Sequence, residues 1–274
     1  MTYQLATANI WNGTRWVPAD DGTPIGLGTF VFNNSTNVTA SATPHTKGAW
    51  LQLVASTTDA IDLLRFAAQA FTSNTATATL VDIGYGAAGS EVVLLSNIAV
   101  GSTSWRGAAN NEESVFYVPI PTVAAGTRIA VRSQSVIASK VASLWITAFK
   151  TGKPATSVTT IGASTATSRG TSIGTAWTQV IASTATDYRW LSCFISGSSA
   201  SMTNTSATLS VGYGAAGAEI TIGSFPMSNN STEIVAPNFG VAVATIMAGV
   251  QAGTRLVAKT SVSVNCDLVI VGVQ

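Results

Sequence analysis

The residues whose types and spacing most resemble those of a catalytic site are three pairs of carboxylates. They are Asp59 with Asp62, Glu112 with Glu113, and Asp82 with Glu91. A glycoside hydrolase needs such a pair, because one acid protonates the leaving oxygen while a second carboxylate acts as base or nucleophile. The chain is largely two similar copies, and Glu91 recurs as Glu219 whereas Asp82 is replaced by Ser210. One retained acid per copy falls short of this mechanism, so we predict that the chain is not an enzyme.

Other chemistry-bearing residues are sparse. His45 is the only histidine, and it lies in a Thr- and Pro-containing stretch without a counterpart in the second copy. No Cys/His cluster has the spacing of a metal site, and the glycine-rich stretch 84–89 lacks the lysine of a phosphate-binding loop. We therefore predict no metal and no cofactor. Cys193 and Cys266 both belong to the second copy, where they form either two small buried thiols or one disulfide.

Basic residues recur at matching positions in the two copies. Arg128 and Arg132 correspond to Arg255 and Lys259, and all four fall on the predicted outer face of a strand. One interpretation is that they contact an acidic glycan or a partner subunit. The other is that they pair with Glu91 and Glu219 and discourage edge-to-edge strand pairing.

The tryptophans divide into repeated and unrepeated ones. Trp50 and Trp177 occupy matching positions, and we expect both in the core. Trp105 and Trp190 have no aromatic counterpart, and Trp105 falls in the polar stretch 101–114, which reads as a loop. Because an exposed tryptophan can pack on a sugar or anchor an interface, both are candidates for glycan contact. Interface or local packing is the alternative.

The elements that position these residues follow from an internal repeat. Trp177 lies 127 positions after Trp50, within matching segments AWLQLVAST and AWTQVIAST. GYGAAGSE at 84–91 recurs as GYGAAGAE at 212–219, and AGTR at 125–128 recurs at 252–255. The order and the near-constant offset define two units, residues 29–150 and 151–274, joined by a short linker at 150–155 and preceded by residues 1–28.

Within each unit the copies share apolar residues at every second position. Val81, Ile83 and Tyr85 match Leu209, Val211 and Tyr213, and Val92 and Leu94 match Ile220 and Ile222. A period of two indicates strands with one buried face, so these residues are predicted to point inward. The final strands, 144–149 and 268–273, are apolar on both faces and must be covered on both sides, by the other unit or by another subunit.

These patterns predict an all-β chain of two tandem jelly-roll-like β-sandwiches with about eight strands each. Residues 63–70 are the one stretch where we allow a turn or two of helix. The N-terminal segment contains Ile10-Trp11-Asn12-Gly13-Thr14-Arg15-Trp16-Val17, a hairpin signal in which Trp11 and Trp16 meet across two strands. A lone hairpin is barely stable in water, so this one should dock, either on the first unit or on another chain.

The low charge and the apolar content of the chain limit the kinds of partner that we expect for it. Charged residues make up only 9% of the chain, against roughly 25% in a typical soluble domain. The net charge of +1 gives no reason to expect binding to nucleic acid. No apolar run is long enough for a membrane helix, and the first ten residues lack the pattern of a signal peptide. A weakly charged chain with much apolar surface is expected to bury part of it against copies of itself, for which we expect a trimer or hexamer.

Two sets of motifs resemble a known class. The Trp-Asn-Gly-Thr-Arg-Trp segment resembles N-terminal segments of phage tail and fibre proteins, and the paired GYGAAGSE and AGTRIAVR motifs resemble a repeated β-domain of phage virion proteins. The resemblance implies a virion structural protein, made in the host cytoplasm: a head decoration or fibre, or a tail or baseplate attachment component that contacts other virion proteins. It carries no binding residues. The alternative function is a carbohydrate-binding adhesin or receptor-binding module that contacts a host surface glycan.

Overall fold

The computed structural model describes residues 9–11, 16–18, 28–71, 79–100, 102–103, 115–135, 137–162, 172–196, 206–228, 240–262, 264–265 and 267–274. In this part of the chain all regular structure is β-strand, so the all-β prediction is confirmed. The stretch 63–70 lies inside the strand Ile61–Phe71, and the helical turn that we allowed there is wrong. Leu64 and Phe66 alternate inward along this strand with Arg65 between them, which is the period of a strand.

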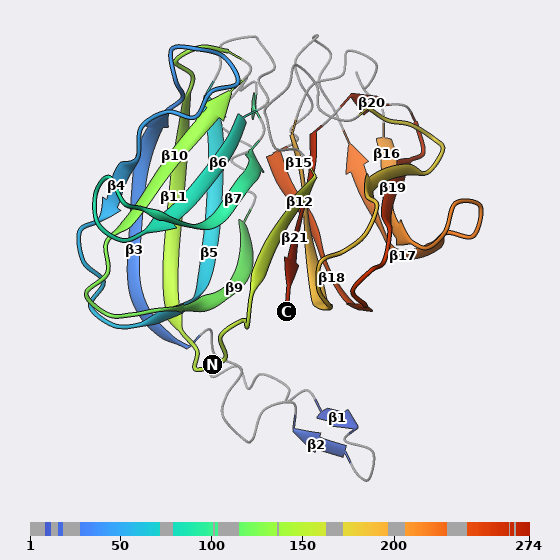
Figure 1. The fold of residues 1–274 in the computed structure, drawn as a ribbon, viewed down its shortest axis with the longest axis horizontal. Coiled ribbons are helices and arrows are strands. Elements are labelled where there is room, and N and C mark those ends of the chain that lie inside the picture. The colour runs from blue at the N-terminus through green and yellow to red at the C-terminus, as the bar shows by residue number, and fades with distance from the viewer. Residues whose placement is uncertain are drawn as a thin grey trace, which may run out of the picture.

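The described part of the first unit contains nine strands. They are β3 (Thr29–Thr39), β4 (Leu51–Val54), β5 (Ile61–Phe71), β6 (Thr79–Tyr85), β7 (Val92–Val100), β8 (Ser102–Thr103), β9 (Val115–Val123), β10 (Ile129–Ser135) and β11 (Val141–Lys150). One sheet has the order β3-β11-β5, with β9 and the short β8 pairing β5, and the other has the order β4-β10-β6-β7. The two sheets form the sandwich on the left of Figure 1.

The second unit repeats this arrangement. Its strands are β12 (Val158–Gly162), β13 (Ser172–Ile173), β14 (Thr178–Ile181), β15 (Tyr188–Ser196), β16 (Ser206–Tyr213), β17 (Ile220–Ser228), β18 (Gly240–Val250), β19 (Leu256–Thr260), β20 (Val264–Asn265) and β21 (Asp267–Val273). The main sheets have the orders β12-β21-β15-β18 and β14-β19-β16-β17, and β13 pairs β20.

The strand order identifies both units as jelly rolls. Without the short β8, β13 and β20, the described residues of each unit form eight strands. Numbering them one to eight along the chain gives the same two sheets in each unit, 1-8-3-6 and 2-7-4-5. This is the double-sheet jelly-roll order, in which the last strand pairs with the first strand at one edge of its sheet and with the third strand at the centre. The prediction of two tandem jelly-roll-like sandwiches is therefore confirmed.

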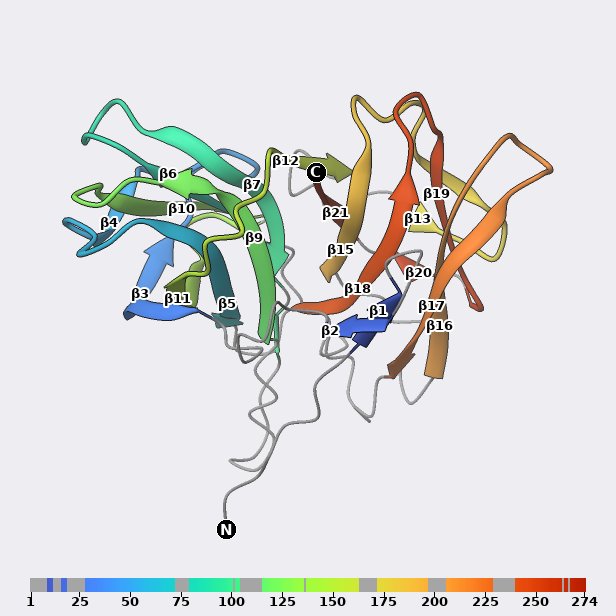
Figure 2. The same cartoon turned by 90° about the horizontal axis from the view of Figure 1, so that it is seen from below.

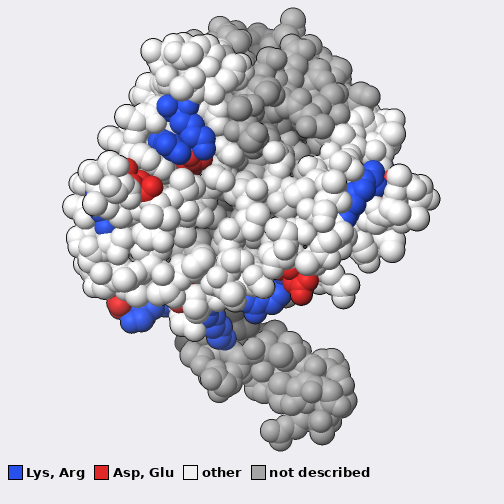
Figure 3. Space-filling model, in the orientation of Figure 1, with Lys and Arg blue, Asp and Glu red and all other residues white. Residues whose placement is uncertain are grey.

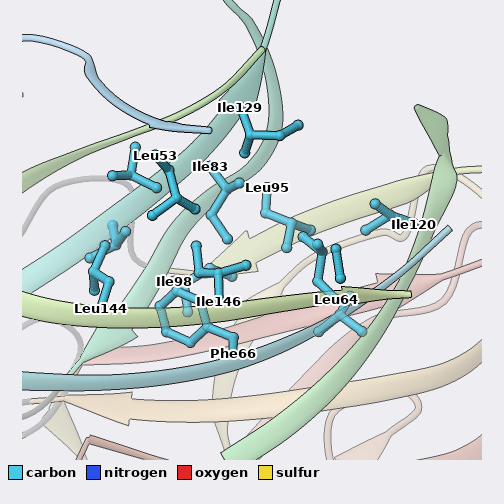
Figure 4. Packing of buried hydrophobic residues seen from close by; sticks show 14 of the residues in the cluster. Leu53, Leu64, Phe66, Ile83, Leu95, Ile98, Ile120, Ile129, Leu144 and Ile146 are labelled. Atoms are coloured by element: carbon cyan, nitrogen blue, oxygen red, sulfur yellow. The ribbon is translucent and has the colours of Figure 1, made fainter. Parts of the chain in front are cut away.

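Each sandwich encloses an apolar core. Figure 4 shows part of the first core, where Leu64 and Phe66 of β5 and Leu144 and Ile146 of β11 face Ile83 and other residues of the opposite sheet. The second core is built around residues such as Leu209 and Ile270. Alternation along the strands places these residues inward, as the repeat predicts.

The two units share an apolar interface. Figures 1 and 2 show that the sheet β12-β21-β15-β18 is the one of the second unit that faces the first, with β21 in contact with β7 and β9. Phe194, Val269, Val271 and Val273 belong to the same buried cluster as the first unit's core. Strand β21 is thus buried on one face by its own unit and on the other by the first unit, which explains its apolar residues on both faces.

The chain between the units is fixed by hydrogen bonds. Asp62 accepts the backbone N–H groups of Thr151 at 2.6 Å and Gly152 at 2.7 Å. The N–H of Ala155 donates to the carbonyl of Ile120, and Ala155 itself is buried in the shared cluster. The predicted linker is therefore held against the first unit.

The N-terminal hairpin is present. Strands β1 (Asn9–Trp11) and β2 (Trp16–Pro18) pair antiparallel, with Trp11 opposite Trp16 in the register. The surface on which it docks stays a prediction.

Candidate functional site

The repeated arginines each close a network of hydrogen bonds with a repeated glutamate. Arg128 Nη1 lies 2.8 Å from Glu91 Oε1, and Arg128 Nε donates to Gln52 Oε1 at 3.2 Å. Arg255 makes the same contacts with Glu219 at 3.0 Å and Gln179 at 3.1 Å. Of the two interpretations of these arginines, the geometry shows the one in which Arg128 pairs with Glu91 and Arg255 pairs with Glu219.

The glutamates also fix the glycine-rich turns. Glu91 accepts the N–H of Gly89, and Glu219 accepts the N–H of Gly217, both at 3.0 Å. Gly89 and Gly217 have φ near +84° and +82°, the left-handed region that glycine adopts without strain. The repeated GYGAAG motif is therefore a turn held by a carboxylate and an arginine.

These contacts change the acidity of both glutamates. Burial raises the pKa of Glu91, but hydrogen bonds from its own backbone N–H, from Arg128 and from Gly89 outweigh burial and hold the pKa below its ordinary value. The hydrogen bond from Arg255 is the largest influence on Glu219, and its pKa is lowered in spite of burial. Both carboxylates are consequently stabilised in their charged form.

A cation also covers each repeated tryptophan. The guanidinium carbon of Arg132 lies 4.3 Å from the Trp50 ring centre, and Lys259 Nζ lies 4.5 Å from that of Trp177. Beneath the rings lie Gly84 and Gly212, where a Cβ atom would come within 2.7 and 2.9 Å of the indole.

Both tryptophans are half-buried on the outer face of their sheets and belong to neither core cluster, so the expectation that they are core residues is wrong. A glycine has no side chain, so the outer face of the sheet is flat enough at that position for an indole to lie on it. The glycines at positions 84 and 212 are therefore the sequence feature that could have indicated this arrangement.

The two copies differ beside these tryptophans. Asp82 is 1% exposed and accepts hydrogen bonds from Lys47 at 2.6 Å, Arg132 at 2.8 Å and the backbone N–H of Asn97 at 2.9 Å. Its counterpart Ser210 shares a hydrogen bond with Ser224 instead. Asp82 is thus occupied by three donors, and the other acidic candidates Asp59 and Asp62 are bonded to Lys150 and to backbone N–H groups.

The remaining candidates are placed as follows. Trp190 of β15 is half-buried against the cluster shared by the units, and its Nε1 is buried without a partner among the described residues. Trp105, Glu112 and Glu113 lie outside the described residues, as does Cys266.

Cys193 is a free, fully buried thiol, and burial raises its pKa to about 12. His45 is exposed, with φ of 59°. Within the described part, no three His, Cys, Asp or Glu residues gather as metal ligands would.

A half-open pocket of about 220 Å³ lies where the units meet. Val93 and Leu94 of β7 supply apolar walls, and Thr122, Thr156 and Ser157 supply polar ones. The pocket is thus lined on one side by the first unit and on the other by residues 156–158, which lead into the second unit.

One further surface was not apparent from the sequence. The outer face of the sheet formed by β3, β11, β5 and β9 carries amide, hydroxyl, guanidinium and aromatic side chains, and we name it the arginine–amide face. It consists of Asn33, Asn37, Arg65, Tyr117, Ser143, Trp145 and Thr147. Asn33, Thr147, Arg65 and Tyr117 are successive cross-strand partners, so they form one row across four strands.

The described residues contain no helix that is long and apolar enough to cross a membrane. No family model and no curated protein matches the sequence. Among solved structures, the viral major capsid protein STIV MCP is similar at a TM-score of 0.30 and 12% identity, over 88% of this chain and 95% of that one. The CBM22-1–CBM22-2 tandem domain of Xyn10C from Paenibacillus barcinonensis is similar at a TM-score of 0.27 and 9% identity, over 90% and 98%. The fold assignment rests on the strand order, independently of these scores.

Proposed function

We propose that this chain is a non-enzymatic structural component of a bacteriophage particle, either a head decoration or fibre or a tail or baseplate attachment component. It acts by self-association and by docking on other virion proteins. The proposal begins from the resemblance of the paired motifs to phage virion domains. The jelly roll, which occurs in viral capsid and lectin domains, is compatible with it, although a fold alone does not determine a function.

The observation that carries the proposal is a pair of apolar residues exposed at matching positions. Val92 is 52% exposed and Ile220 is 54% exposed, at the starts of β7 and β17. The prediction that both are buried is wrong. Each pairs with a half-buried tyrosine at the end of the neighbouring strand, Val92 with Tyr85 and Ile220 with Tyr213. The pairing of β7 with β6 shifts register on both sides of Ile83, and the residues of β7 that reach the core are Leu95 and Ile98. Both copies thus hold a large apolar residue in contact with water, as a surface that meets a partner would.

The low charge of the surface supports the same function. Figure 3 shows charged residues in a few small groups, with wide uncharged areas between them on this face. Several charged groups are also neutralised internally, such as Arg128 with Glu91 and Arg132 with Asp82. Such a surface presents little net field to keep copies apart, which favours association.

The test is the protein content of purified particles. Particles of the phage whose genome encodes this chain are banded on a density gradient and quantified by mass spectrometry against the major capsid protein. The proposal predicts a fixed number of copies per particle that survives repeated banding in high salt. Absence from banded particles, with the protein recovered only in the soluble lysate, would overturn it.

A further inference from the structure

We propose that the arginine–amide face binds a carboxylate-bearing oligosaccharide. This goes beyond the structural function proposed above, since a virion component need not bind a glycan. The face lies on the first unit, on the outer side of the sheet β3-β11-β5-β9.

The second unit shows what this face looks like when protein covers it. By their place in the sheet, Trp145, Thr147 and Arg65 correspond to Val269, Val271 and Ser192 of the second unit. Val269 and Val271 pack against the first unit and are 0% exposed. Where this face meets protein it therefore carries buried valines beside the small, buried Ser192, whereas in the first unit it is polar, cationic and aromatic.

The polar groups of this face are arranged as hydrogen-bond donors. Thr147 Oγ1 donates to Asn33 Oδ1 at 3.0 Å, and the Ser143 hydroxyl donates to Asn37 Oδ1. With both amide oxygens occupied, each exposed asparagine has its Nδ2 group left to donate, and neither Nδ2 has an acceptor among the described residues. A guanidinium group also only donates. The matching ligand is rich in acceptors.

Charge selects among such ligands. In the described part of the chain Arg65 has no carboxylate partner, in contrast to Arg128, Arg132 and Arg255. The four strands contain one carboxylate, Asp62, which is occupied by two backbone N–H groups of the chain between the units. The fork of a guanidinium matches a carboxylate with two parallel hydrogen bonds, so an acidic sugar fits Arg65 best.

Aromatic side chains supply the remaining contact. Tyr117, 37% exposed, is the cross-strand partner of Arg65, and the half-buried Trp145 lies in the next row along the sheet. Their rings offer flat apolar surface for the C–H face of a sugar beside the polar groups that its hydroxyls need. Four strands at a spacing of about 4.8 Å span about 14 Å, which suits a short oligosaccharide rather than a single sugar.

The experiment measures binding of the full chain to a printed array. The probes are sialylated and uronic-acid-containing oligosaccharides, each beside its carboxyl-reduced neutral counterpart. We expect binding to carboxylate-bearing members and loss of binding on carboxyl reduction. Arg65→Met should weaken binding by about tenfold or more, the worth of one charge-assisted hydrogen-bonded pair. The matched control Arg189→Met, at an exposed arginine of the second unit, should bind as the unaltered protein does.

Asn33→Asp guards against a folding artefact, because residue 33 is exposed and the change keeps the size of the side chain while it replaces the Nδ2 donor with a negatively charged oxygen. It should also weaken binding. No binding to any carboxylate-bearing probe, equal binding to reduced probes, or unchanged affinity in both Arg65→Met and Asn33→Asp would overturn the proposal.

Discussion

The guanidinium group of Arg132 lies over the ring of Trp50, with its central carbon 4.3 Å from the ring centre, and the six-membered part of the indole lies against Gly84. The second unit rebuilds this stack as Lys259, Trp177 and Gly212. A cation over an indole contributes on the order of 0.5–1 kcal/mol at an exposed site. The stack thus fixes a tryptophan outside the core, on a surface where a glycine leaves room for it.

Gly84→Ala tests this stack. The added Cβ would lie 2.7 Å from the Trp50 ring and 3.0 Å from the Val92 carbonyl oxygen, so the indole must move. We expect a loss of about 1–3 kcal/mol in the free energy of unfolding, the usual cost of overpacking, measured by denaturant titration. Gly249→Ala is the control, since nothing lies within 4 Å of its Cβ. Equal stability of the two variants would show that the indole does not depend on the glycine.

Asp82→Ser replaces a buried carboxylate with the residue of the second copy. The change leaves the Asn97 N–H without its acceptor and Lys47 and Arg132 without their counter-charge. We expect a loss of about 2–4 kcal/mol of unfolding free energy, because an unpaired buried donor and unpaired charges are costly. Ser210→Ala at the counterpart should cost less than about 1 kcal/mol, since its hydrogen bond to Ser224 is exposed. Losses of similar size in both would refute a special role for Asp82.

Acid should weaken the arginine–glutamate networks. The pKa values of Glu91 and Glu219 are lowered from the ordinary value of 4.5, so the unfolded chain binds protons at a higher pH than the folded one. Their contribution to stability is complete above 4.5 and is lost as the pH falls through the folded pKa. Between pH 6 and about pH 3, the free energy of unfolding should fall less steeply in the double variant Glu91→Gln, Glu219→Gln than in the unaltered protein. Parallel curves would contradict the lowered values.

Val271→Thr tests the interface between the units. Val271 is fully buried in the shared cluster, and the residue at its place in the first unit is Thr147. Burying a hydroxyl among apolar side chains should cost about 1–3 kcal/mol. Because the interface couples the units, calorimetry should show a broader or divided transition. Leu51→Thr introduces the second copy's Thr178 at a position 40% exposed on β4 and should leave the transition as it is. An unaltered transition in Val271→Thr would mean that the units fold independently.

The repeat and the two-residue period were enough to predict the fold class, because the same residues had to form the same strands twice. They did not reveal the bulge in β7. A bulge changes which residues of a strand face the core, but here no proline or change of composition in the sequence indicates it. The period also placed Val92 and Ile220 inside, although the structure exposes both at the starts of their strands.

The candidate surfaces were harder to predict, because they depend on contacts between units. The apolar β21 indicated a strand covered on both sides, but not that the first unit covers it. Asn33, Arg65, Tyr117 and Trp145 carried no signal for a different reason, since their common face exists only once four strands of the first unit are paired. Arg128 and Arg255, the prominent basic residues of the sequence, are occupied by Glu91 and Glu219.

Self-association through the repeated apolar positions is the central claim, and the mass of the purified protein in solution tests it most directly. Light scattering after size exclusion should give a discrete multiple of 28.0 kDa, with a trimer or hexamer expected. Val92→Thr combined with Ile220→Thr should reduce that mass, whereas Val93→Thr, which introduces the second copy's Thr221, should leave it unchanged. A monomer of 28.0 kDa at every concentration, or a multimer indifferent to Val92 and Ile220, would contradict the account.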